Sequence, residues 1–405
     1  MDVKARWSDF RGSVWPRALL LLVLVAPLVS GVISRFLRGS HWFSDFEAVE
    51  CAGQRLLQGL PIYDPAATCP EMKPSGFVYL PSIAEAFSWI SQTLGSELWR
   101  LVYVGVFFLT FAYLLWVCFI RKGGPGERWD RLLGLGLVTG SAPYWANIAL
   151  PLHAALCLAA WYAPRKPVIF TICLAIAGAI KPVFLTYGLV LLALPLPVWK
   201  RFGLGAAAAV AGLAPTLAFL TMGGGLAEEW SRSIDLFIYD VQPGDGFYGW
   251  IDVLGISSLG LAPSLGWALF ALGLCGCVIV LAGCGGLQAR DRALLGLGVG
   301  ALANPRITPN DTLLLAMLIG ALFALIRLSD MSEGKRRRLA GALALICGLG
   351  ALGQSLDLGD YAPKVVTLAL TLTLVLLCVG YARTHRRALI DDLLGKPHGI
   401  PTASR

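Results

Sequence analysis

The sequence predicts an all-α, polytopic membrane protein. Hydrophobic residues make up 57% of its 405 residues, charged residues only 14%, and the mean hydropathy is +0.69, whereas soluble domains carry about 25% charged residues. Apolar runs of roughly 20 residues, the length that crosses a bilayer, recur from end to end. The first run, residues 18–37, is long enough to span and is therefore interpreted as a membrane span, with no cleavable signal peptide before it.

About twelve apolar segments are predicted to be membrane-spanning helices. In chain order they are 18–37, 98–120, 132–144, 146–163, 168–181, 183–198, 202–221, 264–284, 293–304, 311–327, 339–355 and 363–382. Four of them are shorter than a usual span and flank polar or proline-marked turns at 141–147, 181–182 and 304–311. The segments together predict one transmembrane domain over residues 1–385, followed by a polar, loosely ordered cytoplasmic tail over 386–405.

The distribution of basic residues predicts which connections face the cytoplasm. Of the 33 Lys and Arg residues, 24 fall in 1–17, 121–131, 164–167, 199–201, 286–292, 327–338 and 382–405, and about 16 of the 25 Asp and Glu residues fall in the complementary segments. Because cytoplasmic loops are enriched in Lys and Arg, both termini are predicted to be cytoplasmic. The net charge of +8 is then a topology signal, and no nucleic-acid partner is expected.

Two polar loops, at about 38–97 and 222–263, fall on the outer face in this topology. In the first loop, the capping-box pattern of Ser44 and Glu47 predicts a helix that begins at Asp45. Its apolar face comprises Phe46, Val49, Leu56, Leu57 and Leu60, and its stop signals are Gly59 and Pro61. A second capping-box pattern, Ser82 with Glu85, predicts another amphipathic helix. Such helices favour chemistry at the lipid–water boundary, where a lipid-linked substrate presents its head group.

Cys51 and Cys69 both lie in the first outer loop, while the other eight cysteines lie in apolar runs. An oxidising compartment permits a disulfide between them, and the sequence leaves the bonded and the free state equally open. Cys and His show no zinc-type spacing, and the four His residues are widely scattered, so no metal site is predicted.

Asp45 is the first candidate catalytic residue, as a general base that removes a proton from an acceptor hydroxyl. The alternative is a helix-start carboxylate that only complements the helix dipole. Lys181 lies between two apolar runs, where a charge is costly without a partner, and it is well placed to bind a lipid phosphate. The alternative for Lys181 is a side chain that snorkels to the interface. Arg306, in a turn between two prolines, suits bidentate phosphate recognition.

Several of these segments resemble the motifs of a known enzyme family. Asp45-Phe46, Leu57-x-Gly59-x-Pro61-Ile62-Tyr63-Asp64 and Phe77-x-Tyr79-x-Pro81 resemble the first-loop signature of glycosyltransferase family 87, a group of membrane enzymes in the GT-C superfamily. Ala179-Ile180-Lys181-Pro182 and Asn304-Pro305-Arg306 are similar to later patterns of that family. The chain departs from the family at Leu80, where a second proline is common, and at Thr308–Asp311, where many members carry a histidine.

The resemblance implies a GT-C-type helical bundle that transfers a sugar, chiefly mannose, from a polyprenyl-phosphate donor, with inversion at the anomeric carbon. It implies that Asp45 is the catalytic base and that Lys181 and Arg306 bind the donor phosphate. The residues expected to bind substrate are Glu47, Tyr63, Asp64, Tyr79, Asn147 and Asp311. Because phosphate leaves as a stable anion, one base and cationic groups suffice, and no cofactor is expected.

The expected partners are the polyprenyl-phosphate sugar, a glycolipid or glycan acceptor, and membrane lipids. The expected location is the inner (plasma) membrane, with the site facing the periplasm or the exterior. Two alternatives stay open: a transporter or flippase of a lipid-linked glycan, because broken helices with proline turns also mark transporter sites, and a transferase for arabinofuranose or another hexose. Against the transporter stand the absence of visible paired halves and the concentration of polar groups on one face.

Overall fold

The structure is a computed structural model that describes residues 14–66, 68–240, 243–356 and 361–395. Every regular element in these ranges is a helix, and none is a strand. Six helices are long and apolar enough to cross a membrane, which makes the chain a candidate multi-pass membrane protein. They are α2 (Val14–Leu37), α5 (Ser96–Leu115, extended by the π-helix η1, Trp116–Ile120), α11 (Val198–Met222), α14 (Leu261–Cys284), α17 (Glu333–Ser355) and α18 (Tyr361–Thr384).

Shorter helices pack among the long ones and supply much of the buried core. They are α8 (Ala149–Tyr162), α9 (Pro167–Ile180), the 3₁₀ helix η3 (Pro182–Gly188) with α10 (Leu189–Ala193), α15 (Ala289–Ala303) and α16 (Thr312–Leu328). Nearly every side chain of α15 and α16 is buried. The long helices instead expose apolar side chains such as Leu109, Val210 and Leu269, each about 70% accessible. An apolar outer surface of this kind suits lipid contact.

The predicted span 132–144 is wrong. This segment forms three short elements: α6 (Arg128–Leu132), the 3₁₀ helix η2 (Leu133–Leu137) and α7 (Ser141–Tyr144). Its glycines allow neighbouring backbones to come close: a Cβ atom on Gly134 would lie 2.9 Å from the Ala316 Cα atom, and one on Gly140 would lie 2.3 Å from the Gly31 carbonyl carbon. Glycine is a poor helix former, and here it serves close packing between elements instead.

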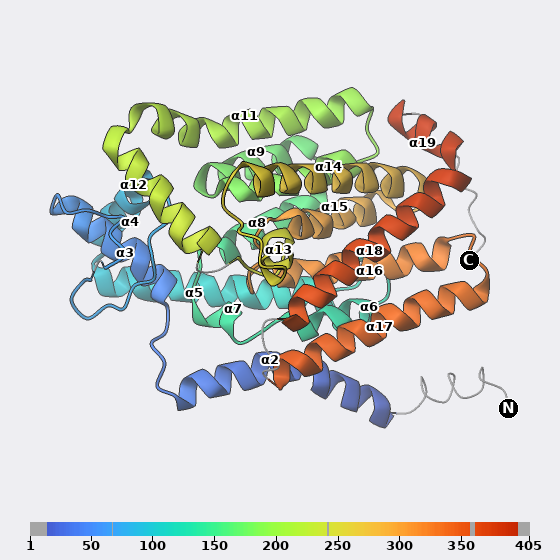
Figure 1. Cartoon of the computed structure of the whole chain (residues 1–405), viewed down its shortest axis with the longest axis horizontal. Coiled ribbons are helices and arrows are strands. Elements are labelled where there is room, and N and C mark those ends of the chain that lie inside the picture. Colours follow the sequence, from blue (N-terminus) through green and yellow to red (C-terminus); the bar gives the residue numbers. More distant parts are fainter. Residues whose placement is uncertain (1–13, 67, 241–242, 357–360, 396–405) are drawn as a thin grey trace.

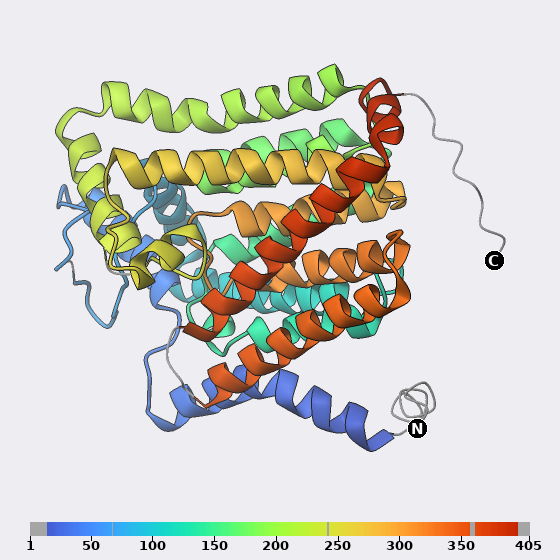
Figure 2. The same ribbon diagram turned by 45° about the vertical axis from the view of Figure 1, so that its right-hand side comes forward.

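The two ends of the bundle differ in what they carry. Figures 1 and 2 show α3 (Ser44–Leu57), α4 (Pro81–Leu94) and α12 (Gly224–Ile234) gathered at one end. The start of α2 and the helix α19 (Arg386–Leu393) lie at the opposite end. Arg201 and Arg292 of the basic connections are there as well, because both contact α19. The polar first loop and these basic connections therefore occupy opposite ends.

The chain after Arg383 is ordered as far as the structure describes it, contrary to the expectation of a loose tail. Asp392, on α19, is only 3% exposed and pairs with Arg201 and Arg292, each at 2.6 Å. The Arg201 guanidinium also donates to the carbonyls of Leu192 and Leu196. One buried carboxylate shared by two buried guanidinium groups fixes α19 against α11 and α15.

Both predicted capping boxes are wrong. α3 begins at Ser44, one residue earlier than predicted, and the Ser44 hydroxyl has no hydrogen-bond partner among the residues described. α4 begins at Pro81, also without a side-chain cap. The start of α3 is held by tertiary contacts instead, because the backbone N–H of Asp45 donates to the carbonyl of Trp145. On the predicted apolar face, Phe46 and Val49 are buried, whereas the side chains of Leu57 and Leu60 are exposed.

Candidate functional site

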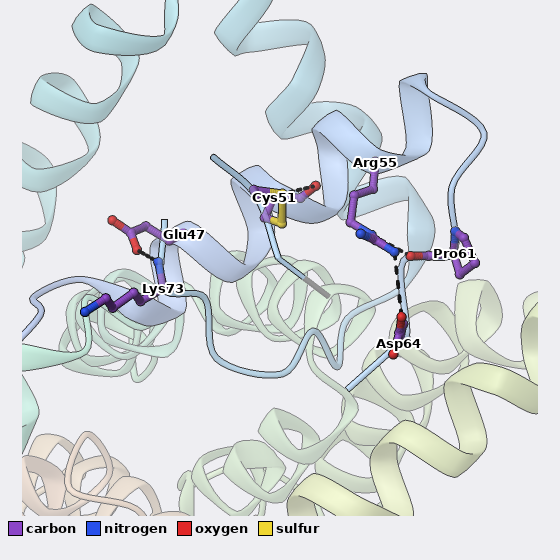
Figure 3. Close-up of a disulfide and its surroundings, with 7 residues drawn as sticks. Glu47, Cys51, Arg55, Pro61, Asp64 and Lys73 are labelled. Carbon is purple, nitrogen blue, oxygen red and sulfur yellow. Dashed lines mark hydrogen bonds and ion pairs between the residues drawn. A yellow bond between two sulfur atoms is a disulfide. The ribbon is translucent and has the colours of Figure 1, made fainter. Parts of the chain in front are cut away.

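The segment from Cys69 to Ser75 runs back along α3 and is bonded to it at three points, of which Figure 3 shows the disulfide and the bond between Lys73 and Glu47. The fastenings are the Cys51–Cys69 disulfide, a 2.9 Å hydrogen bond from the Lys73 N–H to the Glu47 carboxylate, and a 3.1 Å bond from the Ser75 N–H to the Ser44 carbonyl. Rising residue numbers on the segment meet falling numbers on α3, so the two run antiparallel. The structure thus contains the bonded state of the two cysteines.

The Asp45 carboxylate, at the start of α3, accepts a hydrogen bond at each oxygen. The Ser75 hydroxyl donates to Oδ1 at 2.6 Å, and the Asn147 amide donates to Oδ2 at 2.5 Å. Burial raises the pKa of Asp45 above its usual range, while these two hydrogen bonds and the positive charges of Lys181 and Arg306 oppose the rise. The carboxylate is therefore oriented, and it interacts with two cations that are distant in the sequence.

Two non-glycine residues in left-handed conformations flank the contact between Asp45 and Asn147. Phe43 has a φ of 72° and Ala146 a φ of 53°. The Tyr103 hydroxyl donates to the Ala146 carbonyl at 3.0 Å, which helps to hold this turn. Such conformations cost on the order of 1–3 kcal/mol each and persist where the surroundings impose them. Two strained backbone positions therefore lie next to the Asp45 carboxylate, whose two oxygens are both hydrogen-bonded.

Lys181 lies where α9 ends and η3 begins. Pro182 disfavours helical geometry in the residue before it, and Lys181 is accordingly extended, with φ −146° and ψ 97°. Among the residues described, its ammonium group has no hydrogen-bond partner and no ion pair within 4.0 Å. It lies 6.0 Å from the centre of the Phe184 ring and is attracted electrostatically by Asp311 and Asp45. The ammonium donors are therefore available to an anionic ligand.

Arg306 lies in the turn between α15 and α16. Its backbone N–H donates to the Asn304 side chain at 3.1 Å, a local bond that shapes the turn. The Arg306 guanidinium interacts electrostatically with Asp311, Asp45 and Tyr79. The turn also accepts backbone hydrogen bonds from the second outer loop, in which the N–H groups of Asp245 and Tyr248 donate to the carbonyls of Ile307 and Pro305. The residues that follow belong to α13 (Phe247–Val253).

The second polar loop, residues 222–263, also contacts the first polar loop, residues 38–97. The Trp230 indole and the Ser233 hydroxyl of α12 donate to the carbonyls of Val78 and Phe77 at 3.0 Å and 2.8 Å. A Cβ atom on Gly76 would lie 2.3 Å from the Phe237 ring, which belongs to the π-helix η4 (Asp235–Asp240). One outer loop therefore contacts both the segment that carries Ser75 and the turn that carries Arg306.

The remaining predicted site residues divide into two groups. Tyr79 and Tyr63 lie near the cluster: the Tyr79 hydroxyl donates to the side-chain Oδ1 atom of Asn147 at 3.4 Å, and the Tyr63 hydroxyl donates to the backbone carbonyl of Tyr79 at 2.8 Å. Glu47 and Asp64 have other partners. The Glu47 carboxylate is fully buried and contacts His41, Arg100 and the Lys73 N–H. The Asp64 carboxylate closes a turn on the Ala66 N–H and faces Arg55 (Figure 3).

Sequence reasoning missed Ser75 and His153. His153 is completely buried on α8, and its Nε2 atom lies 2.9 Å from Asp311 Oδ1. A histidine inside an apolar run needs a polar partner, which was a usable signal. Ser75 offered none, since a serine in a polar loop is ordinary. Among the residues described, no three His, Cys, Asp or Glu side chains form a group that could hold a metal ion.

No protein-family model, curated protein or solved structure matches this chain. Any proposal for the function of this chain therefore rests on the geometry of Asp45, Lys181, Arg306 and their partners.

Proposed function

We propose that the chain is an integral-membrane glycosyltransferase that moves a hexose, in the first instance mannose, from a polyprenyl-phosphate donor to an acceptor hydroxyl at the outer face. One observation carries the proposal: the oriented Asp45 carboxylate interacts electrostatically with Lys181, whose ammonium donors have no partner in the described part of the chain. A base beside an uncommitted cation is what transfer from a phosphate-linked sugar requires.

In this mechanism the acceptor hydroxyl gives its proton to Asp45 as its oxygen attacks the anomeric carbon. The bond between that carbon and the phosphate oxygen breaks, and the phosphate leaves with the electron pair. Lys181 and Arg306 stabilise the charge that develops on the phosphate. Because phosphate departs as an anion, no acid is needed at the leaving group, and single displacement inverts the anomeric centre. Ser75 and Asn147 keep the Asp45 oxygens oriented during the attack.

The test is sugar transfer from synthetic polyprenyl-phosphate-mannose to a membrane glycolipid extract by the purified protein. Asp45→Asn should lower the rate by about 10²–10⁴-fold, the range expected for a general base. Asp64→Asn is the matched control, since Asp64 is a half-exposed carboxylate of the same loop that pairs with Arg55.

Transfer by the wild type and by Asp64→Asn, with loss in folded Asp45→Asn, would support both the reaction and the base. Full activity in Asp45→Asn would remove Asp45 from the mechanism. Failure of the wild type with mannose, arabinofuranose and other hexose donors would overturn the transferase. Movement of a lipid-linked glycan across proteoliposomes would then favour the flippase.

A further inference from the structure

A buried hydrogen-bonded pair, His153 and Asp311, joins α8 to the start of α16 beside Lys181. His153 is 0% exposed and Asp311 is 3% exposed, and the His153 Nε2 atom lies 2.9 Å from Asp311 Oδ1. The second oxygen of Asp311 accepts two hydrogen bonds from Thr308, one from its backbone N–H and one from its hydroxyl, each 2.7 Å long. Both oxygens of this buried carboxylate are therefore occupied by fixed donors.

Two polar side chains orient the His153 ring. Because an ionised carboxylate only accepts, the Nε2–H donates to Asp311, and the Tyr187 hydroxyl lies 3.3 Å from the Nδ1 atom. The Phe184 ring packs on one side of the imidazole, 4.7 Å between ring centres, and the same ring lies next to Lys181. The imidazole is thus held in orientation one ring away from the lysine.

The charge of Asp311 acts on Lys181 without a direct contact. Asp311 exerts the strongest attraction on Lys181, ahead of Asp45, and it is also the strongest attraction on Arg306. Nevertheless, no ion pair within 4.0 Å joins Lys181 to either carboxylate in the part of the chain that the structure describes. The lysine therefore has a counter-charge nearby, while its N–H donors stay unoccupied.

We infer that His153 is a positioning residue for the donor phosphate. By holding Asp311 Oδ1, it keeps the carboxylate as a fixed counter-charge that balances Lys181 at a distance and leaves the ammonium group free to bind phosphate. Without this hydrogen bond, an Asp311 oxygen can turn to Lys181 and compete with the phosphate. The inference rests on the proposed function, since it assigns Lys181 to the phosphate of a lipid-linked donor.

The test is direct binding, which does not require turnover. The dissociation constants of the purified protein are measured for a short polyprenyl phosphate and for the matching polyprenol. His153→Leu, which removes the donor, should weaken phosphate binding about tenfold, the size of one hydrogen bond to a charged group, and leave polyprenol binding unchanged. His153→Gln, whose amide can reach the same oxygen, should retain most of the affinity. In transfer assays, the donor KM should rise and kcat should fall in His153→Leu, because Lys181 both binds the donor phosphate and stabilises the charge that develops on it.

A double-mutant cycle with Lys181→Met tests the route of the effect. If His153 acts through Lys181, adding His153→Leu to Lys181→Met should cause no further loss. An additive loss, or unchanged phosphate affinity in folded His153→Leu, would overturn the inference. Should His153→Leu fail to fold, Thr308→Val removes one of the two hydrogen bonds to the other Asp311 oxygen and must weaken phosphate binding in the same direction. A wild-type protein that binds the phosphate no better than the polyprenol would instead overturn the proposed function itself.

Discussion

The Asn147 amide donates a 2.5 Å hydrogen bond to the Asp45 carboxylate, joining residues 102 positions apart. Asn147 lies in the turn that follows α7, and Asp45 lies in the first turn of α3. Backbone hydrogen bonds join the same two segments, because the N–H groups of Phe43 and Asp45 donate to the carbonyls of Tyr144 and Trp145. The first polar loop is thus attached to the bundle at Asp45, the candidate base.

Ser75→Ala should shift the pH dependence of transfer. Burial raises the pKa of Asp45, and the hydrogen bond from the Ser75 hydroxyl lowers it. Removing this hydroxyl should therefore raise the pKa of Asp45 further. A base acts only when ionised; activity falls as the pH drops through its pKa, and a higher pKa moves this acid limb to higher pH. We therefore expect the acid limb of the kcat/KM profile to move to higher pH. Ser75→Thr retains the hydroxyl and should retain the profile. An acid limb unchanged in Ser75→Ala would argue against Asp45 as the base.

Asp392→Asn should destabilise the protein by about 3–5 kcal/mol, because it leaves two buried guanidinium groups without their carboxylate. The measurement is the thermal unfolding of the purified protein in detergent. Glu333→Gln is the matched control: Glu333 forms an exposed pair with Arg337, worth at most about 0.5 kcal/mol. Equal unfolding temperatures for the two variants would show that the contacts of α19 contribute little.

Cys51→Ser should lower stability by about 3 kcal/mol, the loss expected when a disulfide across 18 residues is removed. The same change should also reduce transfer, because Ser75 follows the fastened segment and depends on it for its position against Asp45. Thermal unfolding and transfer rate are measured together. Cys173→Ser is the control, since Cys173 is a free cysteine on α9. A stable, fully active Cys51→Ser protein would show that the hydrogen bonds of Lys73 and Ser75 suffice.

Gly140→Ala should destabilise the protein by about 1–3 kcal/mol through overpacking. The new methyl group would lie 2.3 Å from the Gly31 carbonyl carbon and from the Val32 nitrogen, both backbone atoms of α2. Gly105→Ala on α5 is the opposite case, because nothing lies within 4 Å of its Cβ position and alanine favours the helix. When unfolding is measured in detergent, Gly140→Ala should therefore be less stable than the wild type, and Gly105→Ala should be more stable. A neutral Gly140→Ala would mean that α2 can shift at no cost.

The sequence was sufficient to predict the helical fold and much of the candidate site. Runs of apolar residues locate the six long helices, because hydrophobic length is a local property of the chain. Lys181 was identifiable for the same reason, since a charge between apolar runs is conspicuous. Asp45, Lys181 and Arg306 were singled out separately, and in the folded chain the positive charges of Lys181 and Arg306 act on the Asp45 carboxylate.

The errors arise where tertiary contacts override local patterns. The predicted Ser44–Glu47 capping box does not form, because the Glu47 carboxylate contacts His41 and Arg100 instead. Backbone carbonyls of another segment accept the hydrogen bonds at the start of α3. The segment 132–144 is apolar, but its glycines serve close contact rather than a helix. Asp392 looked like part of a solvated tail because both of its arginine partners lie in distant helices. His153 likewise depends on a residue 158 positions away.

The order in which membrane helices are synthesised follows from where the cluster residues lie. The loop that carries Asp45 precedes α5, whereas Arg306 and Asp311 follow α15, and nine α-helices, α6 to α14, lie between α5 and α15 in the described part of the chain. A nascent chain therefore exposes its carboxylate long before the late cation and counter-charge exist to complete the cluster. Under the proposed function, sugar transfer would therefore begin only once α15 and α16 have been synthesised and have joined the bundle, because the cluster is incomplete until then.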